Sequence, residues 1–131
     1  MIFVDTGAWF ALLIADDPNH TAARQWFEKN RTILVTSEYV VDELLTLVRS
    51  RVGILRSIQV GELIFKEELA DLIPVEKRDI DAAWAIFAKY RDKDWSFTDC
   101  VSRVVMERLE ITTAFAFDEH FRQFSTVAVV S

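Results

Sequence analysis

Cysteine, glycine and proline are all scarce in this 131-residue chain, which has one cysteine, three glycines and two prolines. The single cysteine, Cys100, excludes an intrachain disulfide and a cysteine-rich zinc site, so we expect a protein of a reducing compartment, the cytoplasm. Few glycines and prolines beside 51% hydrophobic residues are typical of an ordered chain. The length is close to the commonest domain size, and we expect one domain over residues 1–131.

Long apolar runs and an excess of basic residues are also lacking. No segment approaches the roughly 18 apolar residues of a membrane span. The apolar start contains Asp5 and no basic residue before it, which argues against a signal peptide. The net charge of −6 is the opposite of a simple nucleic-acid-binding module. An enzyme that gathers carboxylates around divalent cations stays compatible with this charge, because the bound metal offsets it.

Strand and helix patterns alternate along the chain. An apolar run at residues 2–4 stops at Asp5, and Gly7 frees the backbone to turn, which predicts a buried strand that ends at an acid. Alternation of this kind predicts an α/β fold with a largely parallel central sheet and helices on both faces. The expected further strands are 33–35, 70–74, 111–117 and 126–130, and the expected helices follow Gly7 and cover 21–29, 37–52, 54–69, 79–90 and 98–109.

Capping residues and apolar spacing refine these helices. Ser37 and Thr98 are expected to cap the helices that follow them. Gly53 is expected to end the helix that Ser37 caps. In the helices expected at 54–69 and 79–90, apolar residues at helical spacing predict the buried faces. These residues are Ile54, Ile58, Phe65 and Leu69 in one helix and Ile80, Ala83, Trp84 and Phe87 in the other.

Three of four candidate acids, Asp5, Asp99 and Asp118, occupy positions that can meet at one edge of such a sheet. Asp5 and Asp118 end apolar strands, Asp99 lies in a first helical turn, and Glu43 borders an apolar helical stripe beside Asp42. Singly, each has a plain explanation as a capping, turn or solvated residue. Together at the carboxyl edge they suit Mg²⁺ or Mn²⁺. Two such ions can activate water and stabilise the leaving oxygen in phosphodiester cleavage.

With IFVDTGAWFALL at the start, VVDELL, SFTDC and FAFDEHF, in this order, the chain resembles PIN-domain ribonucleases, and among them the VapC toxins of toxin–antitoxin pairs. The resemblance covers essentially the whole chain. It implies a three-layer α/β/α fold and a Mg²⁺-dependent endoribonuclease, with Mn²⁺ as a second metal. The catalytic, metal-binding acids that it implies are Asp5, Glu43, Asp99 and Asp118, and the hydroxyl residues that help to arrange them are Thr6 and Thr98.

Within this set we expect Asp5 and Asp99 to be the principal metal ligands. Glu43 and Asp118 are expected to bind the metal directly or through water. His120, beside Asp118, is interpreted as a surface residue or a support for the acids rather than as a general base. The expected products carry a 5′-phosphate and a 3′-hydroxyl.

The resemblance also implies two protein partners, a second copy of the chain in a homodimer and a cognate antitoxin that covers the active cleft. Val60, Leu63 and Ile64 are candidates for the contact surface, with burial inside the monomer as the alternative.

The expected RNA is single-stranded or a loop, because its backbone can enter a cleft. Basic residues near Gly53 and before SFTDC are candidates for phosphate contacts, with a solvated face as the alternative. Trp95 is a candidate for stacking on a base, with packing as its alternative. The basic residues are Arg49, Arg51 and Arg56 in the first group and Lys89, Arg91 and Lys93 in the second.

Other functions fit the sequence less well. Residues 5–7, Asp-Thr-Gly, match the signature of aspartic proteases, but those are all-β proteins and the helical pattern after Gly7 contradicts that fold. A receiver domain would have an acidic pair after its first strand. Two alternatives stay open: a PIN nuclease of RNA processing outside a toxin pair, and a PIN-fold binding module without catalysis. The complete set of four acids favours catalysis.

Overall fold

A parallel five-stranded sheet forms the centre of the computed structural model, which describes residues 1–123 and 128–130. The strands lie in the order β3-β2-β1-β4-β5, and each neighbouring pair is parallel. This confirms the predicted largely parallel sheet. Residues 126 and 127 of the last predicted strand lie outside the described residues. The strands are β1 (Ile2–Val4), β2 (Leu34–Ser37), β3 (Asp71–Ile73), β4 (Thr113–Phe115) and β5 (Ala128–Val130).

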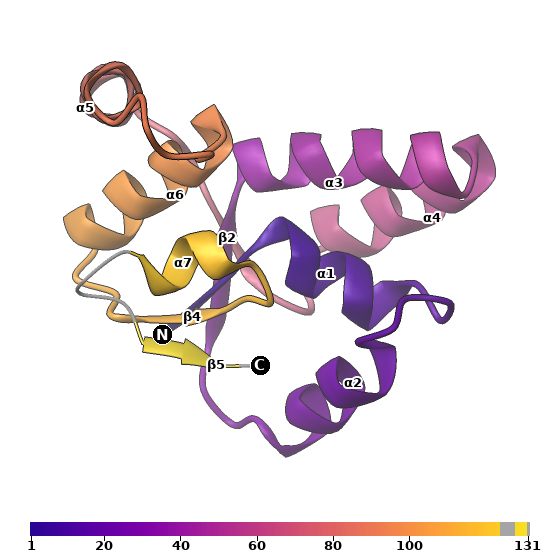
Figure 1. The fold of residues 1–131 in the computed structure, drawn as a ribbon. Coiled ribbons are helices and arrows are strands. Elements are labelled where there is room, and N and C mark those ends of the chain that lie inside the picture. The colour runs from indigo at the N-terminus through magenta and orange to yellow at the C-terminus, as the bar shows by residue number, and fades with distance from the viewer. Residues whose placement is uncertain (124–127, 131) are drawn as a thin grey trace.

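Seven helices are described: α1 (Thr6–Leu13), α2 (His20–Lys29), α3 (Glu38–Arg51), α4 (Ile54–Phe65), α5 (Lys77–Lys89), α6 (Phe97–Arg108) and α7 (Glu119–Arg122). Helices α1 to α4 lie on the right of the sheet in Figure 1, and α5 and α6 lie on the upper left. The chain adds strands in one direction from β1 to β3 and then returns past β1 to β4, so right-handed crossovers place the two groups on opposite faces. The fold is therefore the expected three-layer α/β/α arrangement. Within the described residues, no helix is both long and apolar enough to cross a membrane.

The direction of strand addition reverses between β1 and β4. Val4 pairs with Phe115, and the backbone N–H of Asp5 donates to the carbonyl of Phe115 at 3.1 Å. Phe3, Val4 and Phe115 are fully buried, so the two strands are fixed in the core. In open α/β sheets, ligands bind outside the carboxyl ends of the strands at such a reversal. The fold thus puts residues 5 and 116–118 at the expected position of a site.

Two of the three predicted helix ends are confirmed, and one is wrong. The Ser37 hydroxyl accepts from the Val40 N–H at 3.3 Å, and Gly53, with φ 138°, ends α3. The cap of α6, however, is Ser96 and not Thr98. Ser96 and Asp99 exchange hydrogen bonds, each side chain accepting from the other's backbone N–H at 3.0 Å. This reciprocal pair fixes the Asp99 carboxylate at the start of the helix.

Helix α4 does not bury the predicted face. Ile54, Ile58 and Phe65 are about half exposed, and Leu69 lies beyond the end of the helix. The buried face instead contains small residues, because α4 lies against α3 there. The Ser57 hydroxyl donates to the Leu45 carbonyl at 2.8 Å. The other buried residues of the helix are Val60, Gly61 and Ile64.

Helix α5 likewise leaves Trp84 and Phe87 exposed, although Ala83 is buried as predicted. Its second buried residue is an acid, Asp79, at 1% exposure. Arg108 of α6 binds this carboxylate with two hydrogen bonds of 2.8 and 2.9 Å. Burial opposes the charge of Asp79, but these bonds and the charge of Arg108 hold the carboxyl pKa below its usual value. The ion pair therefore joins α5 to α6 below the surface.

We expect Arg108→Ala to lower the free energy of unfolding by about 3 kcal/mol or more, because it leaves a buried carboxylate without its partner. Arg24→Ala is the matched control, since Arg24 pairs with Glu28 on an exposed face and should change stability by less than about 0.5 kcal/mol. Urea unfolding of both variants measures the difference. Equal losses in the two variants would contradict the assigned role of the buried pair.

Candidate active site

Two of the four acids follow the neighbouring strands β1 and β4. Asp5 comes directly after β1 and is 3% exposed. It holds the capping position of α1 but makes no capping hydrogen bond, so the simple capping explanation does not hold for it. Asp118 does cap a helix, because its Oδ1 accepts from the His120 N–H at 2.8 Å. The strand reversal therefore has an acid on each of its two sides.

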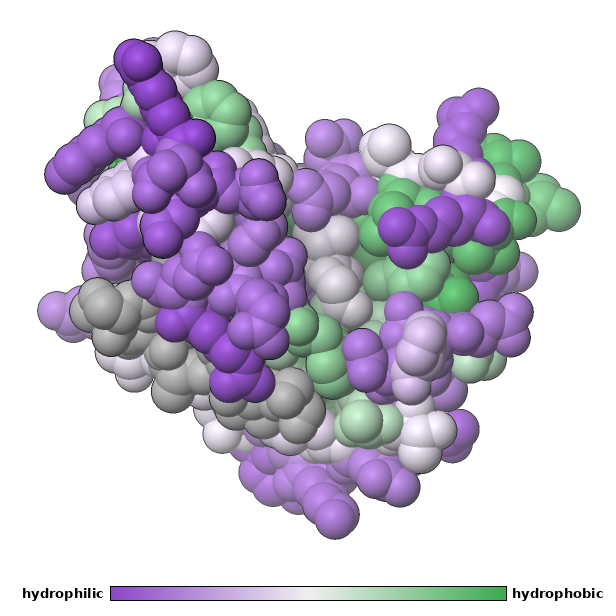
Figure 2. All heavy atoms as spheres, in the orientation of Figure 1, coloured by the Kyte–Doolittle hydropathy of each residue, from purple (hydrophilic) through white to green (hydrophobic). Residues whose placement is uncertain are grey.

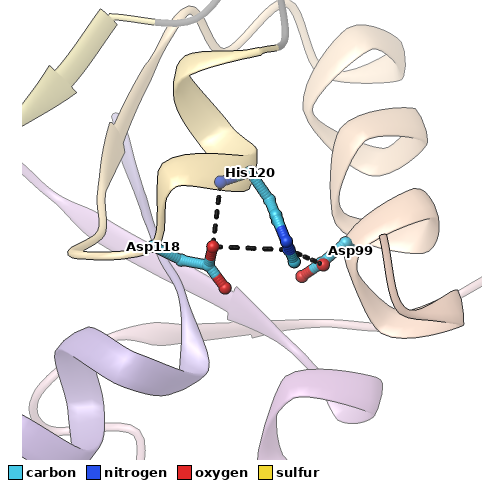
Figure 3. A group of neighbouring side chains, drawn as sticks. All are labelled: Asp99, Asp118 and His120. Atoms are coloured by element: carbon cyan, nitrogen blue, oxygen red, sulfur yellow. Dashed lines mark hydrogen bonds and ion pairs between the residues drawn. The ribbon is translucent and has the colours of Figure 1, made fainter. Parts of the chain in front are cut away.

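Asp99 reaches the same place from α6. Its Oδ2 is 2.8 Å from Nδ1 of His120, which in turn is 3.3 Å from Oδ1 of Asp118. Figure 3 shows the imidazole of His120 between the two carboxylates, with one acid on α6 and the other on the segment that leads into α7. Ligand atoms of these three residues lie within 4.8 Å of one another, a spacing that can hold a metal ion.

The other three acids all raise the pKa of Asp5. Its pKa is raised to about 8, first by burial, then by Asp99, with smaller contributions from Glu43 and Asp118. A hydrogen bond with the Thr6 backbone opposes the rise. Glu43 is half-buried on α3, whereas its neighbour Asp42 is exposed to solvent. The charges of Asp99, Glu43 and Asp118 therefore all act on Asp5, whereas the described residues close enough to share one metal ion are Asp99, Asp118 and His120.

The site contains buried oxygen atoms that fit a divalent cation. Within the described residues, Oδ1 of Asp5 and Oγ1 of Thr6 are buried and have no hydrogen-bond partner. Leaving a buried polar group unpaired costs about 1–3 kcal/mol, and leaving a charged one costs more. Carboxylate and hydroxyl oxygens are the ligand types that Mg²⁺ and Mn²⁺ prefer. Thr98 is half-buried in the first turn of α6, beside Asp99.

From the sequence, His120 was expected to be either a surface residue or a support for the acids. Its side chain is 25% exposed and contacts both Asp99 and Asp118, so it supports the acids. Burial opposes its charge, but the Asp99 hydrogen bond and the nearby acids Asp118, Asp99 and Asp94 raise its pKa. The contact with Asp99 spans 21 residues of sequence, and no local pattern signals it. Ser96, which fixes Asp99, was not predicted as a cap, because the prediction placed the start of the helix at Thr98.

The two groups of basic residues predicted to contact phosphates lie in different parts of the structure. Arg51 ends α3, eight residues or roughly 12 Å along the helix from Glu43. Arg56 donates to the Leu13 carbonyl at 2.8 Å, at the far end of α1 from Asp5. The second group lies at the end of α5 and just before α6, the helix that carries Asp99.

Comparison with known proteins places this geometry in a family. The model of the PIN domain matches residues 2–127. The 23S rRNA-specific endonuclease VapC20 of Mycobacterium tuberculosis is 31% identical over 98% of both chains. Ribonuclease VapC26 of the same organism is 32% identical over 96% of this chain and 91% of its own.

Solved structures agree with the sequence comparison. The crystal structure of M. tuberculosis VapC20, described as a sarcin-ricin loop cleaving toxin, superposes with a TM-score of 0.91 at 28% identity over 97% of both chains. The DNA-bound VapBC complex of Salmonella typhimurium has the same fold, with a TM-score of 0.70 at 13% identity over 99% of this chain and 98% of that one. This chain belongs to the PIN domain family.

Proposed function

We propose that this protein is a Mg²⁺-dependent endoribonuclease, with Mn²⁺ as a second usable metal, and the toxin of a VapBC-type toxin–antitoxin pair. The observation that carries the proposal is the buried Asp5 at the reversal of the sheet, with the charges of three further acids acting on it and with Asp99, Asp118 and His120 close enough to share a metal ion. Unneutralised, four such acids repel one another and an RNA phosphate. The names of the relatives VapC20 and VapC26 support nuclease activity.

We assign the following roles to the acids and to His120 as part of this proposal. Asp5 and Asp99 hold the cation, and Glu43 and Asp118 bind it directly or through water. A bound divalent cation supplies Lewis acidity and lowers the pKa of water at the site. His120 holds the carboxylates of Asp99 and Asp118 in place through Nδ1.

The hydroxyls of Thr6 and Thr98 complete this arrangement. Thr6 follows Asp5 directly and has a buried hydroxyl, and Thr98 precedes Asp99 at the start of α6. Hydrolysis at the site is proposed to leave a 5′-phosphate and a 3′-hydroxyl.

The names of the relatives suggest which RNA to test first as a substrate. Because VapC20 is named for 23S rRNA and described as cleaving the sarcin-ricin loop, we propose a ribosomal RNA loop as the first substrate to examine. Purified protein is incubated with intact ribosomes and with total RNA in Mg²⁺, and new 5′-phosphate ends are mapped. Discrete cuts in ribosomal RNA support the toxin. Cuts confined to RNA precursors favour the RNA-processing nuclease, and intact RNA with folded protein favours the binding module.

The antitoxin is proposed to cover the active cleft and also a groove along α1, α2 and α4. Three adjoining pockets, of about 460, 350 and 460 Å³, share Arg56. Of the predicted contact residues, Val60 and Ile64 are buried in the monomer. The alternative explanation, burial inside the monomer, is therefore correct for these two residues. Leu63 stays partly exposed and lines two of the pockets. Figure 2 shows hydrophobic side chains gathered on the right, over the α3–α4 side of the molecule.

We expect Leu63→Asp to weaken capture of the chain by the product of a small upstream gene by at least about tenfold, because it puts a charge into an apolar contact. Ile33→Asp is the control, since Ile33 is 61% exposed and lies outside this groove. Co-purification of tagged variants measures capture. Equal capture of both variants would show that the partner binds elsewhere. Light scattering of the free protein tests the predicted homodimer.

A further inference from the structure

A small pocket lies where α5 leads into α6, outside the group of acids. Its volume is about 270 Å³, just below the range of sites for drug-sized ligands, which suits a single flat ring system. Its lining combines aromatic rings with cations. The lining residues are Phe87, Tyr90, Arg91, Lys93, Trp95 and Cys100.

Aromatic side chains form the walls of this pocket. The rings of Tyr90 and Trp95 have centroids 5.0 Å apart and planes inclined at 53°. Trp95 and Cys100 are buried and close the inner end, whereas Phe87 is 41% exposed at the outer end. The Trp95 indole N–H donates to the Gln123 side chain at 2.8 Å, which fixes the ring. The pocket is therefore formed before any ligand enters it, which lowers the entropic cost of binding.

The charged residues that line the pocket are both basic. Arg91 and Lys93 are exposed at its mouth, and the ammonium group of Lys89 lies 5.2 Å from the centroid of the Tyr90 ring. Asp92 and Asp94 are also exposed in this segment, but neither is among the lining residues. Aromatic walls with cations at the mouth match the chemistry of a nucleobase and its adjoining phosphates. In a chain of net charge −6, this local arrangement favours an anionic ligand.

The pocket adjoins the candidate active site. Cys100 follows Asp99 in α6. Gln123, which holds the Trp95 indole, is the C-cap of α7, the helix that carries His120 and is capped by Asp118. Helix α6 thus carries both an acid and a lining residue, and the end of α7 is joined to the pocket through the Trp95–Gln123 hydrogen bond.

From this geometry we infer that the pocket binds one unpaired nucleobase of the RNA substrate, next to the scissile phosphate. Tyr90 and Phe87 stack on the base, the buried Trp95 supports the Tyr90 ring from behind, and Arg91 and Lys93 contact the flanking phosphates. The pocket is a specificity site beside the catalytic acids, and a duplex does not fill it because its bases are paired and stacked. The inference rests on the proposed nuclease function.

The test measures binding of single-stranded ten-nucleotide RNAs to the Asp5→Asn protein by fluorescence anisotropy, with each nucleotide replaced in turn by an abasic one. We expect Tyr90→Ala to weaken binding about 5- to 100-fold, the range for loss of one base stack. One abasic position should weaken binding to a similar extent, and its effect should be smaller in Tyr90→Ala than in the protein that keeps Tyr90, because the two changes remove one shared contact. Tyr90→Phe should retain the binding.

Matched controls separate the pocket from general surface effects. Phe65→Ala removes an exposed aromatic ring of α4, and Lys29→Ala an exposed cation of α2, and neither should change binding more than about twofold. Arg91→Ala and Lys93→Ala should each lower the salt dependence of log K by about 0.7 if each contacts one phosphate. Circular dichroism checks that every variant is folded.

Each outcome gives a distinct conclusion. If the abasic and Tyr90→Ala effects add independently, or if Tyr90→Ala binds like the controls, the pocket does not hold a base. If wild-type protein cleaves RNA while all pocket variants keep its affinity and salt dependence, this inference fails and the proposed function stands. If the folded protein neither binds nor cleaves RNA, both fail.

Discussion

Asp5→Asn is expected to reduce RNA cleavage at least about a thousandfold, and Asp99→Asn to do the same. Metal ligands contribute several kcal/mol to stabilisation of the transition state, and each 1.4 kcal/mol corresponds to a factor of ten in rate. Asp5 is central to this result because the charges of Asp99, Glu43 and Asp118 all act on it. Initial rates on an end-labelled RNA measure the loss.

A neighbouring pair of acids on α3 provides the control. Glu43 acts on Asp5, whereas Asp42 is exposed on the same helix. We therefore expect Glu43→Gln to lower the rate at least about tenfold and Asp42→Asn to leave it within about twofold. Wild-type rates in Asp5→Asn or Asp99→Asn, or equal losses in Glu43→Gln and Asp42→Asn, would contradict the assignment of the acids.

The stability of the metal-free protein is expected to fall as the pH rises from 6 to 8. Asp5 has a pKa of about 8 in the folded state, raised mainly by burial, against 3.8 in the unfolded chain. Between these values the folded protein holds a proton that the unfolded chain has lost, so raising the pH favours unfolding. The loss is roughly 2 kcal/mol over these two pH units. Thermal unfolding in EDTA measures it.

The Asp5→Asn variant isolates this contribution. The raised pKa of His120 acts in the same direction, since its stabilisation is lost as the pH rises through its folded pKa. Asp5→Asn should therefore flatten the pH dependence without removing it. Saturating Mn²⁺ should flatten the wild-type curve too, because metal binding expels the Asp5 proton. A variant with the full wild-type slope would contradict the raised pKa of Asp5.

Local patterns in the sequence predicted the elements that position the acids. The apolar run before Asp5 forms β1, Ser37 caps α3, and Gly53 ends that helix. Each of these three features depends on interactions within a few residues, so the local sequence is sufficient to predict it. The strand alternation similarly led to the parallel sheet that brings Asp5 and Asp118 together.

The errors arose where distant contacts decide the structure. Apolar spacing selected the bulky face of α4, but α4 approaches α3 through Ser57, whose side chain is small, and Gly61, which has no side chain. The contact of His120 with Asp99 depends on how α7 folds back over α6 and has no local signature. Hydrophobic periodicity reports which residues can be buried and leaves open which neighbour covers them.

Reversible metal dependence of RNA cleavage tests the central claim most directly. Purified protein is stripped with EDTA, dialysed, and assayed on a mixed RNA pool before and after addition of Mg²⁺ or Mn²⁺, with Asp5→Asn in parallel. We expect no cleavage after stripping, full recovery with either metal, and no recovery in the variant. Cleavage that persists in the stripped protein, or that the Asp5→Asn protein recovers fully with metal, would contradict a metal-dependent nuclease centred on Asp5.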